Sequence, residues 1–232
     1  MPDVRADFTE PAIVPPETFE WVSSPGGEVE RMMLDRVGDE VAVATSLVRY
    51  PVGSRFPAHE HPLGEEYLVL EGEFADEHGR YLPGTYVRNP PGSRHTPFSE
   101  TGCVIWVKLR QFHPEDDRPV VASTTVPIPG EGIAVSELHR FRNEVVTVVA
   151  AAAGTEIAFP AAEEVQEVLV LEGAVRSRDR VLGERGWIRV PAGEGLALAA
   201  TAPARLLHKT RPRAALPGGD ATRATSAASA GT

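Results

Sequence analysis

The chain has 232 residues, of which 42% are hydrophobic, which is enough for one large domain or two small ones with separate cores. Its formal net charge of −10 disfavours nucleic acid and anionic membranes as partners, because both are bound through clusters of basic side chains. The single cysteine, Cys103, rules out an internal disulfide and a multi-cysteine zinc site, and it suits the reducing cytoplasm.

The first half of the chain reads as short β-strands. Its N-terminal sequence has no signal-peptide core, and no apolar run reaches transmembrane length, so we expect a soluble cytoplasmic protein. Segments rich in Val, Leu and Tyr then alternate with turns containing Gly, Pro and Asp, which predicts strands of about five to ten residues. The charged, proline-bracketed segment 113–119 is expected to connect two domains. The expected strands of this half are 28–34, 40–49, 67–70, 85–88 and 103–109.

Strands resume after the connection, and no segment shows a helical period longer than about one turn. From residue 211 onward the sequence is low in large apolar residues, so residues 211–232 are predicted to be a disordered tail. Many short strands without helices indicate an all-β fold of the sandwich or jelly-roll type. We expect one domain over residues 12–115 and a second over residues 116–210. The expected strands of the second half are 120–125, 143–151, 168–171, 187–190 and 196–199.

Two segments 101 residues apart repeat one framework. The segment Gly53–Gly72 aligns with Gly154–Gly173, and both end in the sequence Leu-Val-Leu-Glu-Gly. Four polar residues of the first copy are lost in the second: His59, His61, Glu65 and His95 are replaced by Pro160, Ala162, Gln166 and Leu196. The duplicated framework predicts two similar domains, and the loss predicts that only the first carries the chemistry.

These four residues have the spacing of a metal site. His59 and His61 are two residues apart, so both rings project from the same face of a strand. Glu65 follows a tight turn that lets the next strand run back alongside, and His95 lies 30 residues further on, after a hairpin. Three imidazoles and one carboxylate suit Fe(II), Mn(II), Ni(II) or Zn(II) and leave two of six coordination positions open. We expect one divalent transition metal in the first domain.

The roles of side chains near these four residues follow from the comparison of the two copies and from the strand face on which each side chain lies. Glu66 competes with Glu65 as the carboxylate ligand, but the second copy retains Glu167 opposite Glu66, so Glu65 is the acid lost with the histidines. Arg55, Tyr67 and Val69 lie on the same strand face as the ligands and are candidate substrate-cavity residues. For Arg55 a salt bridge at the rim is the favoured interpretation, and for Tyr67 and Val69 core packing explains the pattern at least as well. Trp106 and Lys108 share one face of a strand, which we interpret as a contact between the two domains.

The first copy resembles the cupin superfamily. Gly53–Gly72 fits the first cupin motif, G(X)5HXH(X)3E(X)6G, without a gap, and Gly84–His95 fits the second, G(X)5PXG(X)2H, although Ser99 stands where many members have Asn. The resemblance implies two tandem double-sheet jelly-roll barrels, a bicupin, with the two histidines and glutamate of the first motif and the histidine of the second as metal ligands.

The amino-acid sequence of the first copy is similar to the ChrR-type cupin group, which includes the cupin domain of ChrR-like anti-sigma factors and small iron dioxygenases. The resemblance implies a mononuclear Fe(II) dioxygenase acting on a small oxygen-chelating substrate, such as a hydroxyketone, diketone or phenol. The alternative is a ChrR-like metal-binding sensor without catalytic activity, often with zinc, and a cupin-type isomerase is a third interpretation. The anti-sigma factors carry an N-terminal helical zinc domain with paired cysteines, which this chain lacks. The expected partner is a small molecule, and a homodimer stays open.

Overall fold

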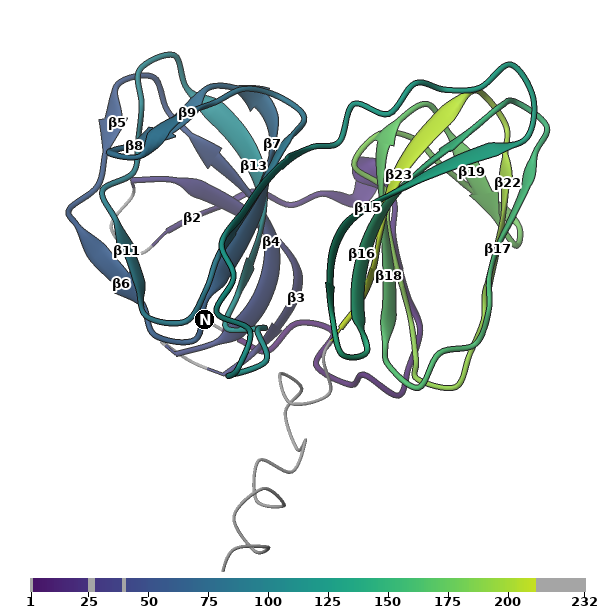
Figure 1. Cartoon of the computed structure of the whole chain (residues 1–232), viewed down its shortest axis with the longest axis horizontal. Coiled ribbons are helices and arrows are strands. Elements are labelled where there is room, and N and C mark those ends of the chain that lie inside the picture. The colour runs from purple at the N-terminus through teal and green to yellow at the C-terminus, as the bar shows by residue number, and fades with distance from the viewer. Residues whose placement is uncertain (1, 25–27, 39–40, 212–232) are drawn as a thin grey trace, which may run out of the picture.

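The computed structural model of the chain describes residues 2–24, 28–38 and 41–211, which form two β-barrels (Figure 1). The expected all-β fold with tandem jelly-roll barrels is confirmed. Residues 212–232 of the tail expected over 211–232 lie outside the described residues. The first barrel contains β2 (Val22–Ser23), β3 (Glu30–Val37), β4 (Val43–Tyr50), β5 (Ser54–Arg55), β6 (His59–His61), β7 (Glu65–Gly72), β8 (Phe74–Asp76), β9 (Gly79–Tyr81), β10 (Thr85–Asn89), β11 (Ser93–His95), β12 (Phe98–Ser99) and β13 (Cys103–Leu109).

The second barrel repeats this arrangement. Its strands are β15 (Ile133–Phe141), β16 (Glu144–Ala151), β17 (Glu156–Phe159), β18 (Gln166–Glu172), β19 (Val175–Ser177), β20 (Arg180–Leu182), β21 (Trp187–Val190), β22 (Leu196–Ala200) and β23 (Ala204–Thr210). A 3₁₀ helix, η1 (Pro16–Thr18), is the one helix in the described part of the chain, and nothing in that part has the length and apolar character of a helix that spans a bilayer.

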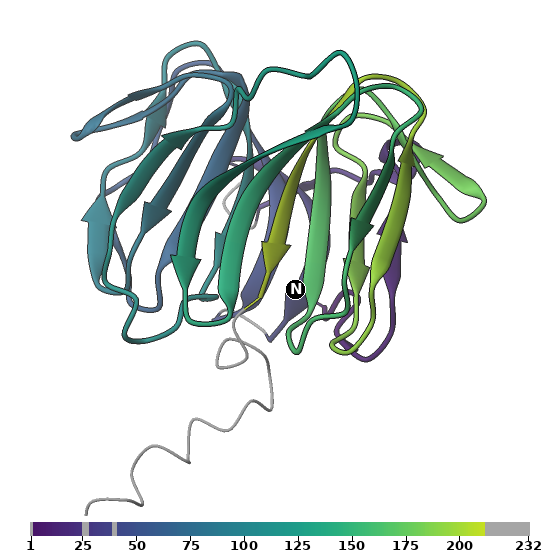
Figure 2. The same ribbon diagram turned by 45° about the vertical axis from the view of Figure 1, so that its right-hand side comes forward.

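Each barrel has one large sheet, and the two large sheets face each other across the centre of the molecule (Figures 1 and 2). Their strand orders are β14-β10-β7-β13-β4-β3-β2 and β1-β21-β18-β23-β16-β15. The outer walls are smaller sheets. These are β11-β6 and β5-β12-β8-β9 in the first barrel and β17-β22-β19-β20 in the second.

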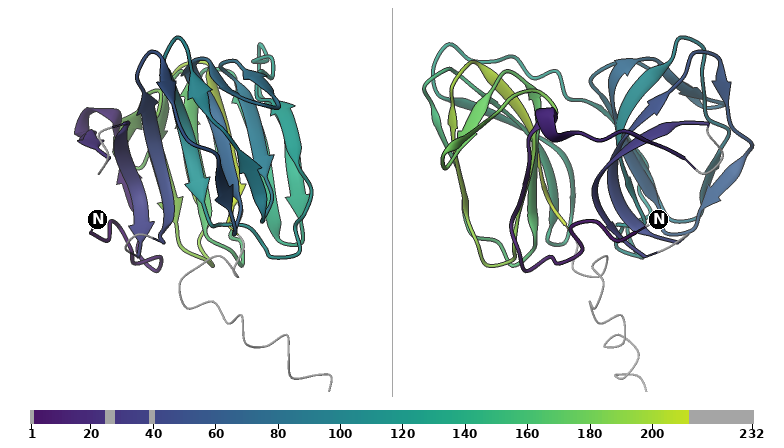
Figure 3. Two further views of the ribbon diagram at one scale, coloured as in Figure 1. Left: turned by 90° about the vertical axis from the view of Figure 1, so that its left-hand side faces the viewer. Right: turned by 180° about the vertical axis from the view of Figure 1, so that it is seen from behind.

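The barrels exchange edge strands. The N-terminal strand β1 (Ala12–Val14) pairs with β21 of the second barrel, and the chain then crosses to the first barrel (Figure 3, right). Conversely, β14 (Val120–Ser123), which follows the connection, pairs with β10 of the first barrel. Each large sheet therefore contains one strand from the far side of the expected boundary between residues 115 and 116. The exchange covers a sheet edge that would otherwise expose unpaired backbone groups.

Alternation along the central strands divides their side chains between three cores. On β13, Ile105 and Val107 pack inside the first barrel, whereas Trp106, with 1% of its surface exposed, packs between the barrels. Leu207 of β23 packs in the same central cluster from the other side. The interpretation of Trp106 and Lys108 as a contact between domains is confirmed.

A layer of buried charges surrounds this central cluster, and its pairs cross reciprocally between the barrels. Lys108 Nζ lies 2.7 Å from a carboxylate oxygen of Glu167, and Lys209 Nζ lies 3.0 Å from Glu66. Both pairs join residues related by the 101-residue offset, as expected for an interface with an approximate two-fold axis. Although burial raises the pKa of a carboxyl group, the surrounding cations outweigh it and hold the pKa of Glu66 and of Glu167 at about 2.

The chain stays folded one residue beyond the expected second domain. Arg211, which the sequence placed in the tail, has no exposed surface and lies 2.6 Å from both Asp35 and Glu167.

The glycines at the end of the repeated framework, Gly72 and Gly173, are present in both copies and have φ of 69° and 75°. A Cβ atom on either would lie about 2 Å from a carbonyl oxygen of the neighbouring strand connection. The framework therefore needs glycine at both positions.

Candidate metal centre

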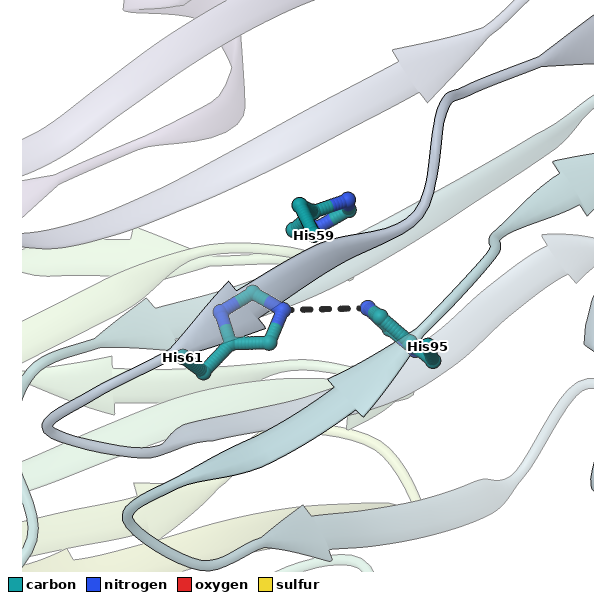
Figure 4. Close-up of side chains that lie close together, drawn as sticks. All are labelled: His59, His61 and His95. Carbon is teal, nitrogen blue, oxygen red and sulfur yellow. Dashed lines mark hydrogen bonds between the residues drawn. The ribbon is translucent and has the colours of Figure 1, made fainter.

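The three histidines predicted to bind a metal lie close together inside the first barrel (Figure 4), and the carboxylate of Glu65 lies near two of them. β6 pairs antiparallel with β11, so His95 lies directly opposite His59, and His61 follows on the same face of β6. Glu65 begins β7 immediately after the turn, in which Gly64 adopts φ 77° and its N–H donates to the carbonyl of His61. A Cβ on Gly64 would meet the ring of Phe112 at 2.5 Å, so this tight turn requires glycine.

The distances fit a single ion. Nε2 of His61 lies 3.0 Å from Nε2 of His95, and Oε2 of Glu65 lies 3.4 Å from each of these nitrogens. One ring nitrogen each of His59, His61 and His95 lies within 4.8 Å of the others. Ligand atoms about 2.1 Å from one ion and at right angles around it are about 3.0 Å apart. The donor set and its spacing therefore match a divalent transition metal.

Three groups outside the ligand set orient it. Asp76 Oδ2 lies 3.2 Å from Nδ1 of His95, the carbonyl of Pro57 lies 3.0 Å from Nδ1 of His59, and the amide of Asn89 donates to Glu65 over 3.4 Å. Such contacts fix the ring orientation and leave Nε2 for a metal. The sequence analysis missed Asp76 and Asn89. At the 101-residue offset their counterparts are Ser177 and Val190. Both polar residues are therefore lost in the second copy together with the ligands, and the comparison of the two copies could have identified them.

The environment sets the protonation of the two facing imidazoles. Burial lowers the pKa of His61, and the neighbouring His95 and His59 add to this effect, against the opposing charge of Glu65. Burial also opposes protonation of His95, but the hydrogen bond to Asp76 and the charge of Glu65 outweigh it and raise the pKa of His95. The lowered pKa favours the neutral form of His61, and the contact with Asp76 favours a proton on Nδ1 of His95, which leaves Nε2 of a neutral His95 free to bind a metal.

A cavity of about 280 Å³ opens beside the four residues. His59, His61 and Glu65 form part of its wall, and the opposite wall comes from the inward face of β3 and β4. Tyr50 and Phe56, with ring centroids 5.2 Å apart, supply an aromatic side. The volume is at the low end of the roughly 300–1,000 Å³ typical of small-molecule sites, so the cavity suits a small ligand.

The three candidate cavity residues lie elsewhere. Arg55 is on the outer rim, with 68% of its side chain exposed, 3.8 Å from Glu100. Tyr67 and Val69 are fully buried in the first-barrel core, where Tyr67 packs against Phe74. None of the three lines the cavity beside the histidines. Strand parity identified the inward face correctly, but it could not tell which inward positions are covered by other core side chains.

The second barrel fills the corresponding space with side chains. Gln166, at the position of Glu65, donates hydrogen bonds to the carbonyls of Pro160 and Glu194 over 2.8 and 2.9 Å. His208 lies 3.0 Å from the Gln166 amide oxygen and stacks on Phe159 with ring centroids 4.0 Å apart. These contacts leave an amide and an aromatic stack where the first barrel has ligands.

A second group of ligand-type residues, Asp116, His139 and Glu144, is buried between the barrels. Arg88 already contacts Asp116 at 2.8 Å and Glu144 at 2.7 Å, and Nε2 of His139 lies 2.8 Å from Asp116. Since a guanidinium occupies the position between the two carboxylates, we assign this group to the contact between the barrels. His139 lies on β15, a strand that the sequence analysis did not predict.

Two facing jelly-roll barrels, the first of which holds a cluster of histidines that could bind a metal, define the class of protein as a bicupin. Residues 9–113 match the family model described as the ChrR Cupin-like domain, so the first half of this chain is a ChrR-type cupin domain. No curated protein matches the chain in sequence.

Solved structures with the same architecture are distant in sequence. A proposed dioxygenase from Nostoc punctiforme is 13% identical with a TM-score of 0.69, over 88% of this chain and 83% of that one. The pirin YhhW from Escherichia coli, solved in complex with nickel(II), is 15% identical with a TM-score of 0.64, over 88% and 100%. Salicylate 1,2-dioxygenase from Pseudoaminobacter salicylatoxidans, solved with gentisate, is 14% identical with a TM-score of 0.63, over 87% and 81%. These likenesses establish the fold.

Proposed function

We propose that the first barrel is a mononuclear non-haem Fe(II) dioxygenase that acts on a small oxygen-chelating substrate, such as a hydroxyketone, a diketone or a phenol. The observation that carries the proposal is the close approach of three imidazoles, with the carboxylate of Glu65 3.4 Å from two of them, beside a small cavity. A bound Fe(II) ion would supply Lewis acidity and the electrons for reaction with dioxygen. Two of the solved structures described above are dioxygenases by name, which supports the proposal at the level of the fold.

The residues of the chain would hold the geometry and limit the access of water. Asp76 accepts the Nδ1 proton of His95 and so keeps Nε2 directed toward the ion. The aromatic pair of Tyr50 and Phe56 presents an apolar surface to a bound substrate. A small, partly apolar cavity orders the reactants and excludes competing water.

Oxygen uptake tests the proposal. Full-length protein loaded with Fe(II) under anaerobic conditions should consume dioxygen with at least one member of a panel of hydroxyketones, diketones and phenols, measured with an oxygen electrode. The His95→Ala variant should lose this activity, because it lacks one ligand. His113→Ala is the matched control, since His113 contacts only surface groups such as Arg142. Uptake no faster than that of free ferrous ion across the panel would contradict the proposal.

One observation favours a second function, namely the match of residues 9–113 to a domain named for ChrR. In that case the metal would be structural or signal-sensing rather than catalytic. Protein as isolated would then carry tightly held zinc and show no oxygen uptake after exchange to Fe(II). The two measurements together therefore separate a dioxygenase from a metal-binding sensor.

A further inference from the structure

The cavity beside the metal centre is lined by three arginines, although the chain as a whole carries a net charge of −10. Arg31 and Arg36 lie on β3, and Arg110 follows the last residue of β13. Among the described residues, the carboxylates in the lining are Glu60, which is exposed, and Glu65, which faces His61 and His95. A metal ion held by Glu65 would add further positive charge. The cavity is thus a cationic region on an acidic protein, and such regions concentrate anions.

The strand register places these arginines at two levels along the strands of the barrel. Leu109 pairs with both Glu65 and Ala44, and Ala44 pairs with Arg36, so Arg36 lies in the same cross-strand row as Glu65. Three strand spacings make that separation about 14 Å at most between the backbones. Arg31 pairs with Val48, two inward-facing rows further along the barrel. Arg31 and Arg110 therefore line the cavity at different levels along the strands.

The side chain of Arg31 has no anion of its own. It is half-buried, faces the cavity between the inward-facing Val29 and Met33, and makes no hydrogen bond or ion pair with any described residue. Arg110 likewise makes only a backbone hydrogen bond, to Gly64, among the described residues. By contrast, Arg49 on the outer face of the neighbouring strand is paired with Glu30 at 3.0 Å. An arginine directed into a cavity without a carboxylate partner is available for an incoming one.

We propose that this cavity selects small organic acids, and that Arg31 is the residue that binds the substrate carboxylate, with Arg110 as a second cation at the rim. The inference rests on the proposed function, because it names the class of molecule that the same site would take. A 2-hydroxy acid, a 2-oxo acid or a phenolic acid combines a carboxylate with the oxygen pair that a metal chelates. The aromatic side of the cavity, Tyr50 and Phe56, accommodates the carbon skeleton.

Binding to redox-inert protein tests this directly, without turnover. Zinc-loaded full-length protein is titrated calorimetrically with three acids and their neutral amides: lactate and lactamide, pyruvate and pyruvamide, salicylate and salicylamide. At least one acid should bind ten or more times more tightly than its amide. Arg31→Gln should reduce that preference about tenfold, because the guanidinium contributes a charged hydrogen bond that the amide of glutamine cannot replace. Arg110→Gln should reduce it by a smaller factor.

Arg49→Gln is the matched control, since it removes one positive charge from the same pair of strands on the outer face; it should leave the preference unchanged. Zinc content and melting temperature are measured for every variant, so that a lost ligand or an unfolded protein is recognised. Equal affinity for every acid and its amide, or an unaltered preference in both Arg31→Gln and Arg110→Gln, would overturn the inference.

The two proposals fail in different ways. Oxygen uptake with neutral diketones, together with no preference for acids, would support the dioxygenase proposal and contradict the carboxylate site. An Arg31-dependent preference for acids without oxygen uptake by the Fe(II) protein would keep the carboxylate site and remove the dioxygenase.

Discussion

Glu65 and Glu66 are consecutive residues of β7 with opposite surroundings. Glu65 faces the interior of the first barrel, where it approaches two imidazoles, whereas Glu66 points between the barrels and contacts Arg88 at 2.8 Å. The alternation of a strand produces this division. It also explains why the second copy keeps the glutamate that faces the other barrel and has lost the one beside the histidines.

Exchanging each carboxylate for an amide should therefore have two distinct effects. Wild-type protein should hold one metal per chain by elemental analysis. Glu65→Gln should lose most of that metal and remain folded, because it removes a ligand from a site that is not part of the main core. Glu66→Gln should keep the metal but lose about 3–5 kcal/mol of unfolding free energy in chemical denaturation, because it leaves buried cations without their anion. Equal metal losses in the two variants would contradict the assignment.

At the scale of single elements, β1 belongs to the second barrel in space although it precedes the first in sequence. Val14 of β1 has 1% of its surface exposed and packs in the central cluster, opposite Trp187 in the sheet register. The strand completes the edge of the second large sheet, and its position depends on burial rather than on sequence proximity.

A charge on β1 should destabilise the molecule without affecting the metal centre. Val14→Asp should cost several kcal/mol of unfolding free energy, because it buries an unpaired carboxylate. The metal content of the protein that remains folded should be unchanged, since the ligands are in the first barrel. Glu17→Asp, on the neighbouring exposed 3₁₀ turn, is the control and should be neutral within about 0.5 kcal/mol. An unchanged unfolding free energy in Val14→Asp would show that β1 does not stabilise the second barrel.

On β23, His208 should make the second barrel sensitive to acid. Burial lowers the pKa of His208 from 6.5 to about 4, and its neighbours Gln166, Thr147 and Phe159 are uncharged. The folded state therefore binds fewer protons than the unfolded state between these pH values. The contribution of neutral His208 to the unfolding free energy is complete above pH 6.5, and the unfolding free energy falls by roughly 3 kcal/mol as the pH drops toward 4.

The unfolding free energy of His208→Gln, measured against pH, should fall less over this window than that of the wild type. His78→Gln provides the comparison, because His78 is exposed. Parallel pH profiles of wild type and His208→Gln would show that another group is responsible for the acid sensitivity.

At the scale of the whole molecule, the reciprocal ion pairs join the barrels into one cooperative unit. Lys108 lies within 2.8 Å of Thr45 and Glu167, and burial lowers the pKa of this lysine to about 8 despite the nearby carboxylates. Arg211 also contacts Glu167 from the second barrel. A network of this kind is costly to break at one member, because the remaining charges stay buried.

Lys108→Met should therefore lower the unfolding free energy by about 3–5 kcal/mol, and both barrels should still unfold in a single transition. Adding Glu167→Gln should cost less than the sum of the two separate changes, because the pair is then removed together. Arg140→Met breaks the exposed pair with Glu137 and should cost under about 1 kcal/mol. Strict additivity of the double variant would mean that Lys108 and Glu167 are not coupled.

The strands with a strong local pattern were predictable, and those with a compromised pattern were not. The apolar runs of β4, β7 and β13, and of β16 and β18 in the second copy, follow from their Val, Leu and Tyr content and the turn residues that bound them. The strands β15 and β23 were missed. β15 is an edge strand that is largely exposed, and β23 contains Arg205, His208 and Lys209, which limit its apolar run to Leu206 and Leu207.

The sequence by itself determined the duplicated framework, the four residues that converge on one point and the loss of those residues from the second copy. These are matters of spacing and strand parity, which a linear pattern records. The tertiary structure alone decided that Asp76 supports His95, that Arg31 and Arg110 face one cavity, that β1 and β14 change barrels, and that Lys108 meets Glu167. Each of these depends on which distant strands become neighbours, and that is set by the burial and hydrogen bonding of whole sheets rather than by any local segment.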